Sequence, residues 1–115
     1  MEYKLLVHID VSEPNRLRFA LDNIRNFFKG LGDNKGDVVL VANGPAVNLF
    51  TREECTDAVA INELASKGVK FQICNNALVK FNIKKEQLVD NLSVVPAGMV
   101  ALVEWQQQGY AYVKP

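Results

Sequence analysis

Five consecutive residues, Val38-Val39-Leu40-Val41-Ala42, are all apolar. A strand that is covered on one face only would alternate apolar with polar side chains, so this segment requires cover on both faces. Such strands are typical of parallel sheets that lie between layers of helices. The segment therefore predicts an α/β protein with a central, mainly parallel sheet.

The rest of the sequence alternates predicted strands with predicted helices. Further strands are expected at residues 5–9, 69–74, 92–95 and 110–113. Helices are expected from Pro14 to Leu31, from Thr51 to Gly68, from Asn75 to Asn82 and from Gly98 to Gly109, with one helical turn over 84–89. The apolar side chains of the first helix recur at helical spacing, as a helix with one buried face requires. This alternation indicates a parallel sheet with helices on both faces.

The start of the second helix has a local signal of its own. Thr51-Arg52-Glu53-Glu54 matches a capping box, in which the threonine and the glutamate satisfy each other's free backbone donors. Phe50 and Cys55 stand where the apolar pair of a hydrophobic staple would lie. The second helix is therefore predicted to begin at Thr51.

Charge and hydropathy exclude several classes of protein. Thirteen basic and thirteen acidic residues cancel, so no strong field would attract nucleic acid or an anionic membrane. No apolar run approaches the ~20 residues of a membrane-spanning helix, and the first ten residues do not resemble a secretory signal. We therefore expect one cytoplasmic domain over residues 1–115, with both cysteines reduced.

Candidate site residues follow from the rule that open α/β sheets bind ligands beyond the carboxyl ends of their strands. Backbone donors at the starts of the next helices gather at the same edge. The rule selects residues that end or follow four of the predicted strands: His8, Asp10, Asn43, Gly44, Cys74, Asn75, Asn76 and the segment 96–98 with Gly98.

Cys74 is the main candidate for chemistry. It ends a predicted strand and directly precedes a helix, where the positive end of the helix dipole favours thiolate over thiol. The competing interpretation is a buried, small apolar side chain. Cys55 is expected to serve packing only, on the inward face of the second helix. The two cysteines form no Cys-x-x-Cys motif, which argues against a dithiol redox pair.

The polar candidates each have two interpretations. His8, the one histidine, would act as a base or hold an anion near Cys74, or it is a hydrogen-bonded histidine of the core or its rim. Asn43, Asn75 and Asn76 would donate to an anionic sulfur or a small ligand, or they serve turns and helix caps. Dinucleotide, Walker and metal-ligand motifs are absent, so we expect no cofactor and no metal.

Several stretches, in order along almost the whole chain, resemble the DsrE/DsrF-like family of the sulfur-relay superfamily. The similarity is to a small, single-domain branch in which many relatives have no established activity. The stretches that carry the resemblance are residues 7–10, 20–26, 41–44, 68–78, 94–98 and 108–115. They include Val7-His8-Ile9-Asp10, Val41-Ala42-Asn43-Gly44 and Ile73-Cys74-Asn75-Asn76.

The resemblance implies a three-layer α/β/α sandwich with a five-stranded parallel sheet, assembled as a homo-trimer or homo-hexamer. In sulfur-relay members a cysteine after the third strand carries sulfur as a persulfide, and Cys74 takes that position. The resemblance also implies proteins that donate and accept sulfur. The predicted function is an intracellular sulfur carrier or sulfurtransferase-like subunit, and the residues do not decide whether it is an enzyme.

Two other functions stay open. One is a non-catalytic, oligomeric module that binds a ligand or regulates a partner. The near-zero net charge, the lack of a base–nucleophile arrangement and the aromatic residues Phe50, Trp105 and Tyr110 suit that function. The other is thiol redox sensing by Cys74, for which no second cysteine is placed as a resolving partner.

Overall fold

The computed structural model describes residues 2–115. Its strands are β1 (Tyr3–Ile9), β2 (Gly36–Ala42), β3 (Lys70–Cys74), β4 (Ser93–Val95) and β5 (Ala111–Val113). Its α-helices are α1 (Pro14–Leu31), α2 (Ala58–Ser66), α3 (Asn75–Lys80) and α4 (Gly98–Gln107), and its 3-10 helices are η1 (Gly44–Phe50) and η2 (Lys85–Gln87). Within residues 2–115, no helix combines the length and the apolar character needed to cross a membrane.

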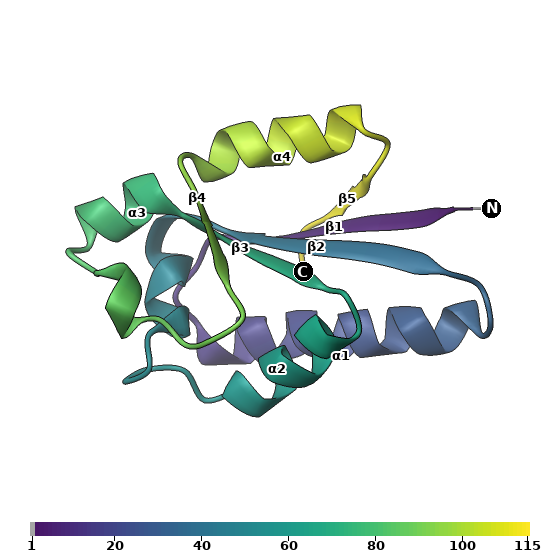
Figure 1. Ribbon diagram of the computed structural model, residues 1–115, viewed down its shortest axis with the longest axis horizontal. Coiled ribbons are helices and arrows are strands. Elements are labelled where there is room, and N and C mark those ends of the chain that lie inside the picture. Colours follow the sequence, from purple (N-terminus) through teal and green to yellow (C-terminus); the bar gives the residue numbers. More distant parts are fainter. Residues whose placement is uncertain (1) are drawn as a thin grey trace.

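The strands form one sheet in the order β4-β3-β2-β1-β5, and every neighbouring pair is parallel. In Figure 1, α1 and α2 lie below the sheet and α4 lies above it. The prediction of a three-layer α/β/α sandwich with a five-stranded parallel sheet is therefore confirmed. The order also places the last strand beside the first, which the sequence pattern did not reveal.

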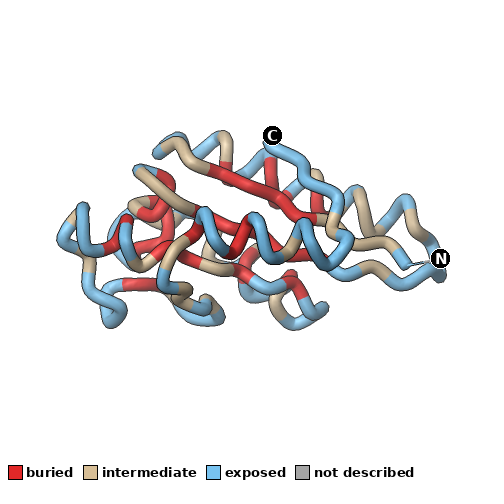
Figure 2. Tube along the Cα trace, turned by 90° about the horizontal axis from the view of Figure 1, so that it is seen from above, coloured by how far each residue is buried: buried red, intermediate tan, exposed pale blue. Residues whose placement is uncertain are grey.

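The core is divided unequally between the two faces of the sheet. Residues 38–42 of β2 are each at most 2% exposed, as their unbroken apolar run predicted. Leu40 belongs to the larger core beneath α1 and α2, whereas Val39 and Val41 belong to the smaller core beneath α4. Figure 2 shows the buried residues along the strands and the exposed residues in the outer turns. β2 is thus the central strand against which both helix layers pack.

The prediction that the second helix begins at Thr51 is wrong. Thr51 Oγ1 does accept a hydrogen bond from the Glu54 amide at 3.2 Å, and the Cys55 amide donates to the Thr51 carbonyl at 2.8 Å. This single turn does not continue, and α2 begins only at Ala58. Thr51 instead pairs with Leu88 in an antiparallel bridge, so a tertiary contact outweighs the local capping signal.

Candidate functional site at the carboxyl ends of the strands

Two of the predicted site residues meet at the carboxyl ends of β1 and β2. His8 in β1 is 6% exposed, and its Nε2 lies 2.7 Å from Oδ1 of Asn43, which directly follows β2. His8 Nδ1 lies 2.6 Å from the hydroxyl oxygen of Tyr112 in β5. Three adjacent strands, or the residues that directly follow them, therefore contribute one side chain each to a continuous line of hydrogen bonds.

Cys74 and Gly98 lie beside Asn43. Cys74 is the last residue of β3 and is 6% exposed, and Gly98 is the first residue of α4. A Cβ on Gly98 would lie 2.9 Å from the Asn43 Cβ, 3.1 Å from the Cys74 Cβ and 3.6 Å from the Cys74 Sγ. Only a residue without a side chain fits against both neighbours. We call Tyr112, His8, Asn43, Gly98 and Cys74 the strand-end cluster.

The chain changes sides of the sheet at this cluster. β1 and β2 lead to α1 and α2 on one face, whereas β4, the neighbour of β3, leads to α4 on the other face (Figure 1). Open α/β sheets bind ligands where the connections diverge in this way. Cys74 is the N-cap residue of α3 and also contacts the first residue of α4. The free backbone N–H groups of helix starts favour negative charge on nearby atoms.

The other predicted site residues lie outside the cluster. Gly44 has a left-handed φ of 57° at the turn from β2 into η1, a conformation that glycine adopts without strain. Asn75 lines a hollow of about 160 Å³ beside β4, and Asn76 is exposed on α3. Among residues 2–115, neither asparagine side chain is hydrogen-bonded to the cluster.

The segment that follows β5 is held to the end of β1 by charged contacts. Lys114 Nζ lies 2.9 Å from Asp10 Oδ2. This hydrogen bond lowers the pKa of the Asp10 carboxyl and raises the pKa of the Lys114 ammonium. Arg16 donates a further hydrogen bond to the carbonyl oxygen of Pro115 at 2.7 Å. These contacts fix β5 next to β1 and so help to place the Tyr112 hydroxyl beside His8.

Cys55 has different surroundings from Cys74. It was predicted on the inward face of the second helix, and that position is wrong because α2 begins only at Ala58. Cys55 lies in the preceding turn, and its side chain packs against the larger core. Burial raises the pKa of the Cys55 thiol above its ordinary 9.0, and the opposing hydrogen bond from the Asp57 backbone is the smaller effect. Cys55 is therefore a suitable internal control for reactions at Cys74.

Tyr112 is the member of the cluster that sequence reasoning missed. Its register partner in β1 is Leu6, so Tyr112 lies on the same face of the sheet as His8, because side chains two residues apart share a face. The available signal was a tyrosine in a predicted strand, whose hydroxyl needs a polar partner when the ring is packed. That signal becomes specific only when β5 is known to lie beside β1.

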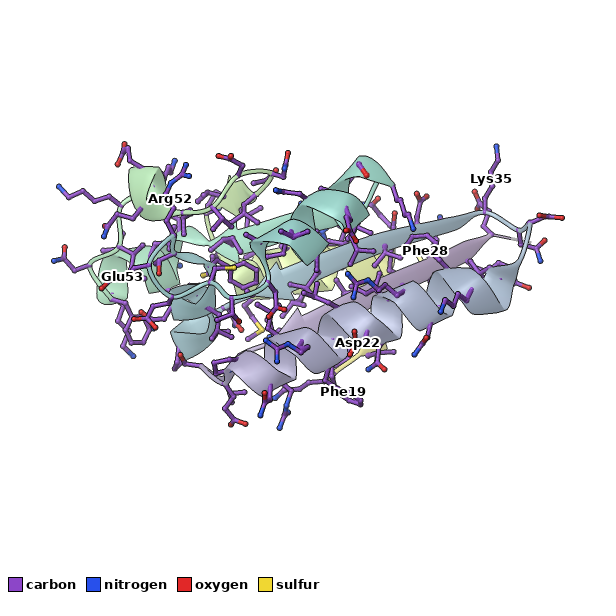
Figure 3. The ribbon with its side chains drawn as sticks, turned by 90° about the horizontal axis from the view of Figure 1, so that it is seen from below. Phe19, Asp22, Phe28, Lys35, Arg52 and Glu53 are labelled. Carbon is purple, nitrogen blue, oxygen red and sulfur yellow. The ribbon has the colours of Figure 1, made fainter. Side chains whose placement is uncertain are left out.

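A hollow of about 690 Å³ lies at the other end of the sheet, and its lining includes Phe28, Lys35 and Gly36. Figure 3 shows Phe28 and Lys35 at the end of the molecule opposite to Arg52 and Glu53. No cysteine or histidine lines this hollow. A smaller hollow of about 310 Å³ between β4 and α4 includes Ala97, the residue directly before Gly98, in its lining. We therefore place the candidate site at the strand-end cluster.

The fold and the cluster together define a class of protein, a three-layer α/β/α domain with a cysteine at the carboxyl edge of its parallel sheet. The chain belongs to the DsrE/DsrF-like family, whose family model it matches over residues 5–115.

Two solved structures are similar to this one over nearly their whole length. One is MTH1491 from Methanobacterium thermoautotrophicum, described as a protein of unknown function. It is 28% identical in sequence, and the two structures superpose with a TM-score of 0.90. The match covers 98% of this chain and 99% of that chain. The other is the YchN protein from E. coli, at 14% identity and a TM-score of 0.74, with 100% of each chain covered. No curated protein matches the chain.

Proposed function

We propose that this protein is a sulfur carrier or a sulfurtransferase-like subunit, and that Cys74 holds the sulfur as a persulfide. The observation that carries the proposal is the position of Cys74, which ends β3 and contacts the first residue of α4 in a DsrE/DsrF-like fold. Helix starts favour the anionic sulfur species that takes part in such transfers. Asn43 adds an amide side chain on the other side of Gly98.

The transfer would take place in two exchange steps at Sγ of Cys74. In the first, the Cys74 thiolate bonds to the terminal sulfur of a donor persulfide, R–S–SH, while the S–S bond of the donor breaks and the donor leaves as a thiolate. In the second, an acceptor thiolate bonds to that terminal sulfur and Cys74 leaves as a thiolate. The sulfane sulfur moves with its proton, so neither step needs an oxidant or a reductant.

The burial of Cys74 suits a carrier that must keep its cargo. At 6% exposed, a persulfide on Sγ would be shielded from small thiols that would remove the sulfur. Loading would then take place when the segment 96–98 or the start of α3 moves aside. The proposal places the protein in the cytoplasm, where reducing conditions keep both cysteines as thiols.

The test is the intact mass after treatment with a sulfane-sulfur donor, compared among the wild type, Cys74→Ser and Cys55→Ser. We expect one added sulfur atom on the wild type and on Cys55→Ser, and none on Cys74→Ser. The Cys55→Ser variant is the matched control, because Cys55 is partly buried and its thiol has a raised pKa. Equal labelling of both single variants, or no labelling of any protein, would refute the proposal.

A second function, a non-catalytic oligomeric module, is favoured by a different observation. Apolar side chains on the outer side of α4 and on β5 are exposed: Met99, Val100, Val103, Tyr112 and Val113. Exposed apolar groups of this kind mark protein interfaces when they are contiguous. We propose a homo-trimer or homo-hexamer that buries them, and a Val103→Asp variant should then dissociate. A wild type that stays monomeric at high concentration would refute the oligomer.

A further inference from the structure

His8 is a buried histidine with both ring nitrogens engaged. It is 6% exposed, and its two partners, the Tyr112 hydroxyl and the Asn43 side chain, lie at 2.6 Å and 2.7 Å. Both distances are short for hydrogen bonds in proteins. Sequence reasoning left open whether this histidine acts on Cys74 or is simply a hydrogen-bonded residue of the core. The two hydrogen bonds of His8 bear on this question, because they determine the orientation of the Asn43 side chain.

The donor or acceptor character of each atom determines the direction of the two hydrogen bonds. The atom of Asn43 that faces His8 is Oδ1, which only accepts, so Nε2 of His8 must carry the proton. A neutral imidazole then has a lone pair on Nδ1, and that nitrogen accepts the proton of the Tyr112 hydroxyl. Tyr112 donates to His8, and His8 donates to Asn43.

This direction fixes the orientation of the Asn43 amide. With Oδ1 bound to His8, the NH₂ group of Asn43 must point away from the imidazole, and among residues 2–115 it has no hydrogen-bond partner. Asn43 and Cys74 lie against the same glycine, Gly98. If the amide were rotated by half a turn, its oxygen would take the place of the NH₂ group, and an amide oxygen has no proton to donate to an anionic sulfur.

We propose that His8 and Tyr112 are positioning residues that hold the Asn43 amide with its NH₂ group available to the sulfur of Cys74. This inference rests on the proposed persulfide function of Cys74. A hydrogen bond to a charged sulfur would favour the Cys74 thiolate, which attacks the donor in the first exchange step and leaves in the second. Neither His8 nor Tyr112 touches the sulfur in this mechanism, since both act through Asn43.

The tautomer of His8 gives a first test that does not depend on sulfur transfer. Long-range ¹H–¹⁵N correlation spectra of the labelled wild-type protein distinguish a protonated Nε2 from a protonated Nδ1. We expect the proton on Nε2 and a bare Nδ1. A proton on Nδ1 alone would mean that Asn43 turns its nitrogen toward His8, and it would overturn the proposal.

Rates of persulfide formation on Cys74 give the second test. Asn43→Asp keeps an oxygen for His8 but replaces the NH₂ group by a second oxygen, so we expect about 10- to 100-fold slower loading, the effect of one hydrogen bond to a charged group. Tyr112→Phe removes the hydroxyl and keeps the ring, and we expect a smaller decrease together with a mixture of His8 tautomers. Tyr110→Phe is the matched control and should load at the wild-type rate, because among residues 2–115 the Tyr110 hydroxyl has no bond to His8.

The outcomes separate this inference from the proposed function. A wild type that takes up no sulfur would refute the function, and the inference with it. A wild type that loads, with Asn43→Asp and Tyr112→Phe loading at the same rate, would refute the inference alone. Thermal unfolding of each variant shows whether a slower rate reflects lost stability. Slower loading by a variant that is as stable as the wild type is the result that a purely structural role would not give.

Discussion

At the scale of single residues, Gly98 shows how tightly the residues of the strand-end cluster pack together. A Cβ added at Gly98 would meet the Cβ atoms of Asn43 and Cys74 at two neighbouring strand ends, and no change of rotamer can move those atoms away. A glycine at the start of a helix is usually replaceable. Here the neighbours Asn43 and Cys74 exclude any side chain, so the glycine is required by packing rather than by backbone conformation.

We predict that Gly98→Ala destabilises the protein. Replacing a helical glycine by alanine gains at most about 1 kcal/mol, whereas overpacking costs about 1–3 kcal/mol, and contacts of 2.9 and 3.1 Å make the second effect the larger one. Urea unfolding measures the difference. The control is Gly30→Ala in α1, where no atom lies within 4 Å of the added Cβ and a gain of about 0.5–1 kcal/mol is expected. A Gly98→Ala variant as stable as the wild type would contradict this packing.

At the scale of secondary-structure elements, the sequence predicted the strands and most helices well, because each has a local pattern. The unbroken apolar run of β2 is the clearest case. The predicted start of a helix at Thr51 was wrong, because the capping bond to Glu54 forms but the segment is then drawn into a bridge with Leu88. No local pattern contains that partner, which lies 37 positions further along the sequence.

The candidate site was predictable only in part, for a related reason. The rule about strand ends selected His8, Asn43, Cys74 and Gly98, and the structure brings these four together. Tyr112 depends on which strand lies next to β1, and strand order is set by the packing of whole elements. The contacts that make the residues one cluster are therefore a property of the sheet and not of any segment.

The contact between β5 and β1 leads to a prediction about pH. In the folded state the pKa of Asp10 is lowered from 3.8, chiefly by the hydrogen bond from Lys114. The ionised Asp10 side chain therefore contributes stability above about pH 3.8, and this contribution is lost as the pH falls through the lowered pKa. We expect Asp10→Asn to be slightly less stable than the wild type at pH 7, because the pair is largely exposed. The two proteins should converge below the lowered pKa. Thermal unfolding of both proteins across pH 2 to 7 tests this prediction. A difference in unfolding temperature that persists at the lowest pH would contradict it.

At the scale of the whole molecule, the two helix layers are unequal. α1 and α2 cover the larger core, whereas α4 covers the opposite face alone and has several exposed apolar side chains of its own. Leu21 of α1 and Leu102 of α4 have the same side chain in these two environments. They are 1% and 4% exposed.

We predict that Leu21→Ala costs more stability than Leu102→Ala. Leucine-to-alanine changes in cores cost about 2–5 kcal/mol, and the value is lowest where the surroundings can collapse into the cavity. Leu21 lies between a long helix and the sheet, so about 3–5 kcal/mol is expected, against about 2 kcal/mol for Leu102 in the thinner layer. Urea unfolding of the two variants decides the matter. An equal or larger loss for Leu102→Ala would mean that the α4 layer is packed as tightly as the other.

The pairing of the first strand with the last has a consequence during synthesis of the protein. His8 and Tyr112 are 104 positions apart, and a ribosome that adds 5–20 residues per second needs roughly 5 to 20 seconds to connect them. Until β5 is synthesised, the edge of β1 that pairs with β5 stays open and His8 lacks the Tyr112 hydroxyl. A nascent chain could already contain Cys74, but the proposed orientation of the Asn43 amide would arise only once β5 has been synthesised. Under the proposed function, sulfur would be loaded efficiently only onto chains in which β5 is already paired with β1.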